Sequence, residues 1–261
     1  MATRALALSR TQEEIEPSVL TTLASICESR GELDDARRHL REALTLPKMS
    51  TMLSGKVVAL SNLGVLEAGE GRLEEARALY ESAYELAEQL HDLPSLAGVA
   101  ANIAITRLEQ GDAAGARPFA ESSLREAKKS GSGVLLVMAR RAAVLVALAH
   151  EERAEARALV VDVLDALENE TRIESWDMAF DTILDYLEAV GSHEAAVGIL
   201  ATAEELYQST GHHKQPAFRA RRTDRTERLR ASIGPERFAT LLASGRSLSR
   251  QQAAVAARAA I

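Results

Sequence analysis

Two asparagines, Asn62 and Asn102, stand in similar apolar surroundings at two places in the chain. An amide side chain both donates and accepts hydrogen bonds, so it can pair with a peptide group whatever the peptide's sequence. Arg107 follows one turn further along the segment that holds Asn102 and would add a charge that attracts an anion. These three residues are the candidate partner-binding groove. The alternative is a polar surface that holds no ligand.

A second candidate is the arginine-rich segment 219–230, whose six arginines and two carboxylates give a net charge of +4. Arg221, Arg225 and Arg228 share one stripe at helical spacing and would contact an anion or a partner. The rest of the chain then carries −11, so the alternatives are a solvated helix or one docked on the acidic remainder. Non-specific phosphate binding also stays open. No aromatic residue lies between the arginines to stack on bases.

Catalytic motifs are missing from the sequence. The nearest approach to a P-loop is Gly55-Lys56, with Ser50 and Val57 where a glycine and a Ser or Thr are needed. There is no serine-nucleophile elbow, His-Glu-x-x-His zinc motif or dinucleotide-binding glycine fingerprint. His212 and His213 have no cysteine nearby and are expected to be an exposed pair. The sequence therefore predicts no enzyme activity, no catalytic residue, no metal site and no cofactor.

Composition narrows the class of protein further. The 261 residues are 46% hydrophobic but only 3% aromatic, and the net charge is −7, which excludes a basic nucleic-acid binder as a whole. A single cysteine, Cys27, excludes a disulfide scaffold. The sequence contains no stretch of about 18 apolar residues free of charge, so it predicts no membrane-spanning helix. We therefore expect a cytoplasmic protein that binds neither a membrane nor nucleic acid directly.

An internal repeat organises these residues. The string Gly-Glu-Leu-Asp-Asp-Ala-Arg at 31–37 returns in similar form at 71–77 and 111–117. The same spacing of 40 reaches Glu151 and Gly191, with alanines five positions later at 156 and 196. Apolar positions on both sides follow a helical period. Each repeat is therefore predicted to hold two helices that are joined by a turn at the glycine.

The predicted fold is an all-α, right-handed superhelical solenoid of about five helix pairs with a C-terminal helical cap. The pairs are expected at about 11–47, 52–91, 94–130, 133–169 and 172–210. This divides the chain into a repeat region, 1–210, and an arginine-rich linker helix with a terminal cap, 211–261. A cap is expected because an open solenoid end would expose apolar surface.

The small residues at recurring positions resemble the tetratricopeptide repeat, with Ala or Gly at position 8 and Ala at positions 20 and 27, as in Gly64, Ala76 and Ala83. The usual unit is about 34 residues, and HEAT and armadillo repeats have periods nearer to 40. The six extra positions are assigned to a longer second helix. The small-residue pattern favours the tetratricopeptide assignment.

The repeat sequences are similar to those of the C-terminal tetratricopeptide regions of large LuxR-type and SARP-type ATP-binding transcriptional regulators. The cues are Ala76–Glu88, Asn102-Ile103-Ala104, Gln110-Gly111-Asp112, Ala201–Leu206 and the tail phrase from Phe238 to Ser249. In that family the region adjoins an NTPase module and a DNA-binding helix-turn-helix, and it senses inducers or partner proteins. Neither module is present in this sequence.

The resemblance implies a non-enzymatic protein-interaction scaffold that serves as the sensor region of a transcriptional regulatory system. In peptide-binding tetratricopeptide proteins an Asn at the position of Asn62 and Asn102 holds the backbone of an extended peptide. The basic residues that would clamp a terminal carboxylate are missing. Two alternatives stay open: a small-molecule inducer sensor with an enclosed pocket, and a self-assembly module that forms a homo-oligomer through an exposed apolar patch.

Overall fold

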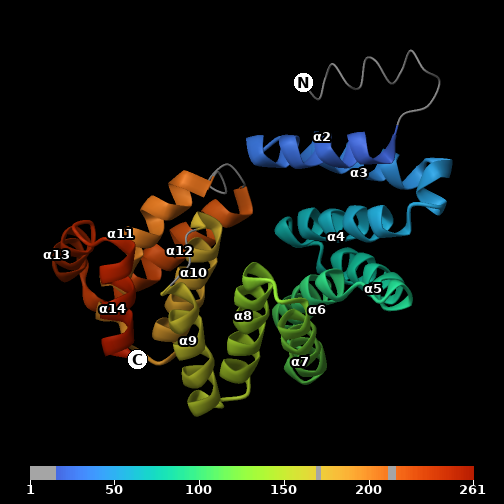
Figure 1. The fold of residues 1–261 in the computed structure, drawn as a ribbon. Helices are drawn as coiled ribbons and strands as arrows, with labels where there is room; N and C mark the ends of the chain where they lie inside the picture. The colour runs from blue at the N-terminus through green and yellow to red at the C-terminus, as the bar shows by residue number, and fades with distance from the viewer. Residues whose placement is uncertain (1–15, 169–171, 211–215) are drawn as a thin grey trace.

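The computed structural model describes residues 16–168, 172–210 and 216–261, and within these ranges it contains helices and no strands. Helix pairs stack side by side along the molecule (Figure 1). The first helices of the pairs are α2 (Pro17–Arg30), α4 (Leu53–Gly69), α6 (Leu93–Glu109), α8 (Gly133–Ala149) and α10 (Ile173–Ala189). The second helices are α3 (Leu33–Thr45), α5 (Leu73–Leu90), α7 (Ala113–Ser130), α9 (Arg153–Leu167) and α11 (His193–Thr210). The predicted all-α helical-repeat solenoid is confirmed.

The turns within the pairs adopt the same backbone conformation from one repeat to the next. Gly31, Gly71, Gly111 and Gly191 have φ between 76° and 81°. Glycine adopts this left-handed region at no steric cost because it lacks a Cβ. Glu151, which stands where the fourth glycine would be, has a φ of 60°. The helix–turn–helix geometry therefore persists where its sequence marker is lost.

Small side chains allow the two helices of each pair to approach closely. The five alanines at position 20 of the repeats are completely buried: Ala36, Ala76, Ala116, Ala156 and Ala196. In the second pair, a Cβ placed on Gly64 would lie 2.6 Å from the ring of Tyr80. Gly64 is therefore required for Tyr80 to pack against α4.

The core differs between the two halves of the chain. Over the first three pairs and their contact with α8, small separate clusters of mainly aliphatic residues fill the spaces between neighbouring helices. From α8 onward a single continuous cluster includes Trp176, Phe180 and Ile183 and extends into the C-terminal helices. The terminal cap comprises α13 (Pro235–Gly245) and α14 (Arg250–Ala260), which bury Phe238, Ala253 and Ala257 in this cluster.

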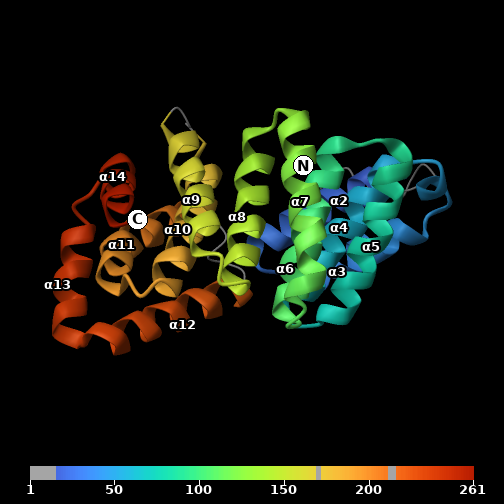
Figure 2. The same ribbon diagram turned by 90° about the horizontal axis from the view of Figure 1, so that it is seen from below.

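Helix α12 (Pro216–Ile233) does not continue the pairwise stacking. In Figure 2 it runs along one edge of the molecule, from α13 past α10 toward α8. Arg222 and Arg225 on α12 reach carboxylates of α10, so the helix lies against the first helix of the fifth pair. The boundary expected between residues 210 and 211 lies at the edge of the described residues and stays a prediction.

Candidate binding groove

Equivalent positions on the first helices line two separate cavities. Val65, Ile105, Leu145 and Asp185 follow one another at intervals of one repeat and occupy the same position on α4, α6, α8 and α10. Val65 and Ile105 line an open pocket on repeats 2 and 3. Leu145 and Asp185 line a second cavity, which Arg228 and Leu229 of α12 border. The same face is therefore open at one end and covered by α12 at the other.

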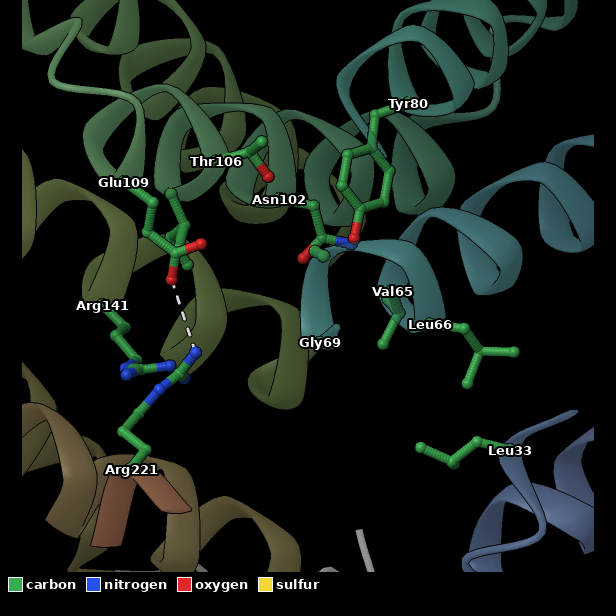
Figure 3. A pocket seen from close by; sticks show the side chains of 12 residues that line it. Leu33, Val65, Leu66, Gly69, Tyr80, Asn102, Thr106, Glu109, Arg141 and Arg221 are labelled. Atoms are coloured by element: carbon green, nitrogen blue, oxygen red, sulfur yellow. Dashed lines mark hydrogen bonds and ion pairs between the residues drawn. The ribbon is translucent and has the colours of Figure 1, made fainter. Parts of the chain in front are cut away.

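The open pocket has a volume of about 150 Å³. Apolar side chains make up most of its wall, and they come from α3, α4 and α6: Leu33, Val65, Leu66, Ala68 and Ile105. Tyr80, Asn102, Thr106 and Glu109 add polar groups, and Arg141 of α8 and Arg221 of α12 lie beside Glu109 (Figure 3). The pocket can therefore hold a mainly apolar group beside hydrogen-bonding partners.

Asn102 is the predicted site residue that the structure places in this pocket. Its side chain and the hydroxyl end of Tyr80 point into the same space in Figure 3. Burial raises the pKa of the Tyr80 hydroxyl, which therefore stays neutral and can donate a hydrogen bond. Within the described residues, the Asn102 amide has no hydrogen-bond partner in the chain.

Asn62 occupies the equivalent place on α4, one turn before Val65, which lines the pocket. Asn62 is half-buried, and it lies outside the lining of the pocket itself. Among the described residues its amide also has no partner in the chain. The structure therefore places the two amides on the same face of consecutive repeats, with Asn102 directly at the pocket.

Arg107 does not line the pocket with Asn102, so we remove it from the candidate groove. Its guanidinium donates to Asp112 at 2.8 Å and to Glu81 at 3.1 Å. It also lies over the ring of Phe119, 5.2 Å from the ring centre. A helix turns 100° per residue, so five positions beyond Asn102 the side chain points toward α5 and α7.

The counterpart of Arg107 one repeat earlier is Glu67, which is 1% exposed. Its carboxylate accepts from Arg41 of α3 at 3.0 Å and forms ion pairs with Arg37 and Arg72. Arg41 and Glu81 are likewise equivalent positions of consecutive repeats. The first two junctions between repeats thus use the same pair of positions with opposite polarity: Glu67 faces Arg41, whereas Arg107 faces Glu81.

The three arginines of the predicted α12 stripe each contact carboxylates of this chain. Arg221 reaches Glu109 of α6 at 3.4 Å, as the dashed line in Figure 3 shows. Arg225 is 4% exposed and pairs with Asp181, Asp185 and Glu188, and Arg228 donates to Glu188 at 3.0 Å. Only Arg221 lies at the same pocket as Asn102. We therefore do not retain Arg225 as an anion contact.

Sequence reasoning missed the row of carboxylates on α10 and the arginine that pairs with it. Asp177, Asp181, Asp185 and Glu188 recur every three or four positions along one helical face. Arg222 donates to Asp177 at 2.8 Å and to Asp181 at 3.0 Å, and it lies 4.1 Å from the ring centre of Tyr207. The signal was present: Arg222 and Arg225 stand three apart, which matches the spacing of the carboxylates.

The facing carboxylates keep Arg225 charged although it is buried. Burial alone would lower the pKa of Arg225, but the facing carboxylates of Asp185, Asp181 and Glu188 more than offset it. The pKa of Arg225 is therefore raised above its ordinary value. Burial likewise acts to lower the pKa of Arg141 on α8, and Asp185 reverses the direction. Asp185 thus links α8, α10 and α12.

Other predicted features have no part in the groove. Cys27 is buried, and burial raises the pKa of its thiol. His212 and His213 lie outside the described residues. Over the described ranges, no group of three His, Cys, Asp or Glu side chains is arranged to hold a metal ion. None of the helices in these ranges has the length and apolar character needed to cross a membrane.

Comparison with known proteins agrees with the repeat geometry. Residues 56–129, which cover nearly all of α4 through α7, match the tetratricopeptide repeat family. This stretch is therefore similar to the tetratricopeptide repeat, a family whose repeats generally mediate protein–protein interaction and serve as non-enzymatic scaffolds. No curated protein matches the chain.

Two solved structures align with most of the chain. The crystal structure of BtubC (BKLC) from P. vanneervenii superposes with a TM-score of 0.58 at 17% identity, covering 89% of each chain. A tetratricopeptide repeat protein from Parabacteroides merdae gives a TM-score of 0.33 at 13% identity, covering 88% of this chain and 98% of that one. At this identity the first likeness establishes a shared fold alone.

Proposed function

We propose that the chain is a non-enzymatic scaffold that binds an extended peptide segment of a partner protein in the open groove of repeats 2 and 3. The observation that carries the proposal is the Asn102 amide, which borders an open pocket without a hydrogen-bond partner among the described residues. Asn62 occupies the equivalent position on α4 and likewise has no hydrogen-bond partner among the described residues. Two amides on one face suit a peptide backbone, which offers donors and acceptors at regular intervals.

The pocket beside Asn102 suits one apolar side chain of the peptide. Its volume of about 150 Å³ lies below the roughly 300–1,000 Å³ typical of small-molecule sites. Val65, Leu66 and Ile105 supply an apolar wall. This favours a peptide side chain over a free inducer at this pocket, so the small-molecule sensor remains the second candidate.

The proposal extends to a sensor or regulatory role in transcriptional control, in the cytoplasm where such a regulator would act. This extension rests on the resemblance of the repeat sequences and of the segment from Phe238 to Ser249 to the regulator family. The fold alone does not carry this part, because helical-repeat scaffolds serve many systems. Self-association would be an additional property of the same scaffold.

The test uses peptides selected from a random phage-displayed library on the full chain. Affinity of a selected peptide is measured by calorimetry for the wild type, for the double variant Asn62→Ala, Asn102→Ala and for Gln89→Ala. Gln89 is an exposed amide on α5 outside the groove, so its loss is the matched control. Losing hydrogen bonds that are buried on binding costs about 1–3 kcal/mol, so the double variant should bind at least about tenfold more weakly.

Two results would contradict the proposal. Unchanged affinity in a folded double variant would place the site elsewhere, with the exposed α12 arginines Arg221 and Arg228 as the next candidates. An equal loss in Gln89→Ala would indicate a general effect of amide removal and not a groove contact. Crosslinking of a selected peptide to α4 and α6, followed by mass spectrometry, checks the location directly.

A further inference from the structure

The carboxylate row of α10 and the arginines of α12 together define a second interaction surface. Asp177, Asp181, Asp185 and Glu188 lie along one face of α10, and α12 covers them. We propose that this row is a binding site for an arginine-rich helix. Helix α12 occupies it as a tethered ligand, and an arginine-rich helix of a partner protein takes its place.

The contacts have the specificity of a recognition site. Arg222 and Arg225 are 6% and 4% exposed, and between them they contact all four carboxylates of the row. The Nε of Arg225 donates to Glu188 at 2.6 Å, and one of its amino groups donates to Asp181 at 3.0 Å. Two arginines three positions apart on a helix match carboxylates spaced by one turn. The surface therefore recognises the spacing of the arginines along the helix and not merely a net positive charge.

Buried ion pairs fix residues 219–233 of α12 against α10, beside the apolar contacts of Leu229 and Ile233. Between residues 219 and 233, Leu229 is the one fully buried apolar side chain, whereas Arg222 and Arg225 are the buried polar ones. Moving charged groups out of water offsets much of the attraction between them. A helix held this way can be exchanged for another that presents the same charges.

The cavities on both sides of α12 indicate what a better occupant would look like. On one side, Leu145, Leu148 and Ser232 border a cavity of about 550 Å³. On the other, Thr226 and Tyr207 border one of about 250 Å³. Helix α12 presents small polar side chains, Thr226 and Ser232, to these spaces. A partner helix with the same two arginines and larger apolar residues at those two places would fill the groove more completely.

This surface lies on repeat 5, so the inference does not depend on peptide binding at Asn102. The test uses the full chain with Arg222→Glu and Arg225→Glu, which sets carboxylates against the row and releases α12. A fluorescent peptide with the sequence of 216–233 is titrated by anisotropy at low salt. Saturable binding to this variant is expected, with at least tenfold weaker binding to the wild type, whose site is occupied.

Two controls separate pattern from charge. Adding Asp181→Asn and Asp185→Asn to the released variant should abolish binding of the peptide. A peptide of identical composition with the arginines moved off the three-residue spacing should bind at least tenfold more weakly. Absence of binding to a released variant with intact helical circular dichroism would overturn the proposal, and so would equal binding of the rearranged peptide.

A second measurement applies if the released variant fails to fold. The wild-type chain is mixed with an excess of the 216–233 peptide that carries Thr226→Leu and Ser232→Leu. Hydrogen exchange should then accelerate in α12 of the chain while α13 and α14 stay protected. Unchanged exchange in α12 at saturating peptide would show that α12 is a fixed part of the fold and overturn the proposal.

Discussion

Two regions of the molecule use the same face of equivalent first helices. The region on repeats 2 and 3 is open, whereas α12 covers the region on repeat 5. Val65 and Ile105 border an open pocket in the first region. Asp185, at the equivalent position of α10, pairs with Arg141 and Arg225 in the second. The first region keeps amides without a partner among the described residues, whereas α12 covers the second.

Side-chain type at a few groove positions decides whether this face stays open. Apolar and amide side chains tolerate water at a surface groove, so nothing is required to cover them. A row of four carboxylates at one helical face repels itself and attracts a cationic helix. Once that helix is docked, each buried charge needs its partner, because an unpaired buried ion is costly.

The largest effect is expected from Arg225→Ala. This change leaves Asp181, Asp185 and Glu188 without their shared guanidinium. Removing one partner of a buried ion network typically costs about 3–5 kcal/mol. Urea unfolding should show a loss in this range, or hydrogen exchange should show α12 undocked. Arg228→Ala is the control, since Arg228 is 61% exposed and its pair should contribute no more than about 1 kcal/mol. Equal effects of the two changes would remove the contrast between buried and exposed pairs.

Gly64→Ala should perturb the open pocket through Tyr80, which packs against Gly64. The added Cβ would lie 2.6 Å from the Tyr80 ring, which also borders the pocket. Overpacking of this kind costs about 1–3 kcal/mol, and the ring should shift toward the pocket. Thermal unfolding measures the cost. The control is Gly198→Ala on α11, where a Cβ meets no atom within 4 Å and helix propensity should give a small gain. A neutral Gly64→Ala would show that α4 and α5 separate easily.

Glu151→Gly acts at the turn of the fourth pair, between the open and covered regions. Glu151 has a φ of 60°, a conformation that costs an L-residue about 1–2 kcal/mol. Glycine relieves that strain but adds entropy to the unfolded chain, so a net gain of up to about 1 kcal/mol is expected. Glu155→Gly, inside α9, should instead destabilise by about 1 kcal/mol. Chemical denaturation of both variants decides the sign at each position.

The smallest effect on stability is expected from Asn102→Ala. The amide has no partner among the described residues, so its removal leaves no other group unsatisfied. The free energy of unfolding should stay within about 0.5 kcal/mol of the wild type. Urea titration of the full chain provides the measurement. A loss above about 1 kcal/mol would make Asn102 a structural residue and would weaken its assignment to peptide binding.

Much of the fold was accessible from the sequence because one period controls both the turns and the close helix contacts. The markers at 31, 71, 111, 151 and 191 located the five turns. The four glycines there have positive φ, and so does Glu151, for which the sequence offered no glycine. The small residues likewise predicted the tight pairs, as Gly64 against Tyr80 shows. These features depend on neighbours within one repeat, which spacing alone can locate.

The site was harder to predict because it depends on contacts between repeats and on the path of α12. Arg107 and Asn102 share a helix, yet the side chain of Arg107 is turned to Glu81 on the neighbouring helix. The predicted arginine stripe on α12 began at Arg221, whereas the two buried arginines are Arg222 and Arg225. A shift of one residue rotates the face by 100°, and only the position of α10 decides between the two stripes.

The reversed polarity at the first two junctions, Glu67 with Arg41 and Arg107 with Glu81, makes the repeats non-interchangeable. Excising one whole repeat between them would keep every turn in phase and every helix at its length. It would also set Arg107 directly against Arg41 and Arg37, where like charges repel each other in a half-buried junction. The order of the units is therefore encoded in charge, independently of the periodicity that encodes their shape, and this limits which recombined or shortened versions of the chain can fold.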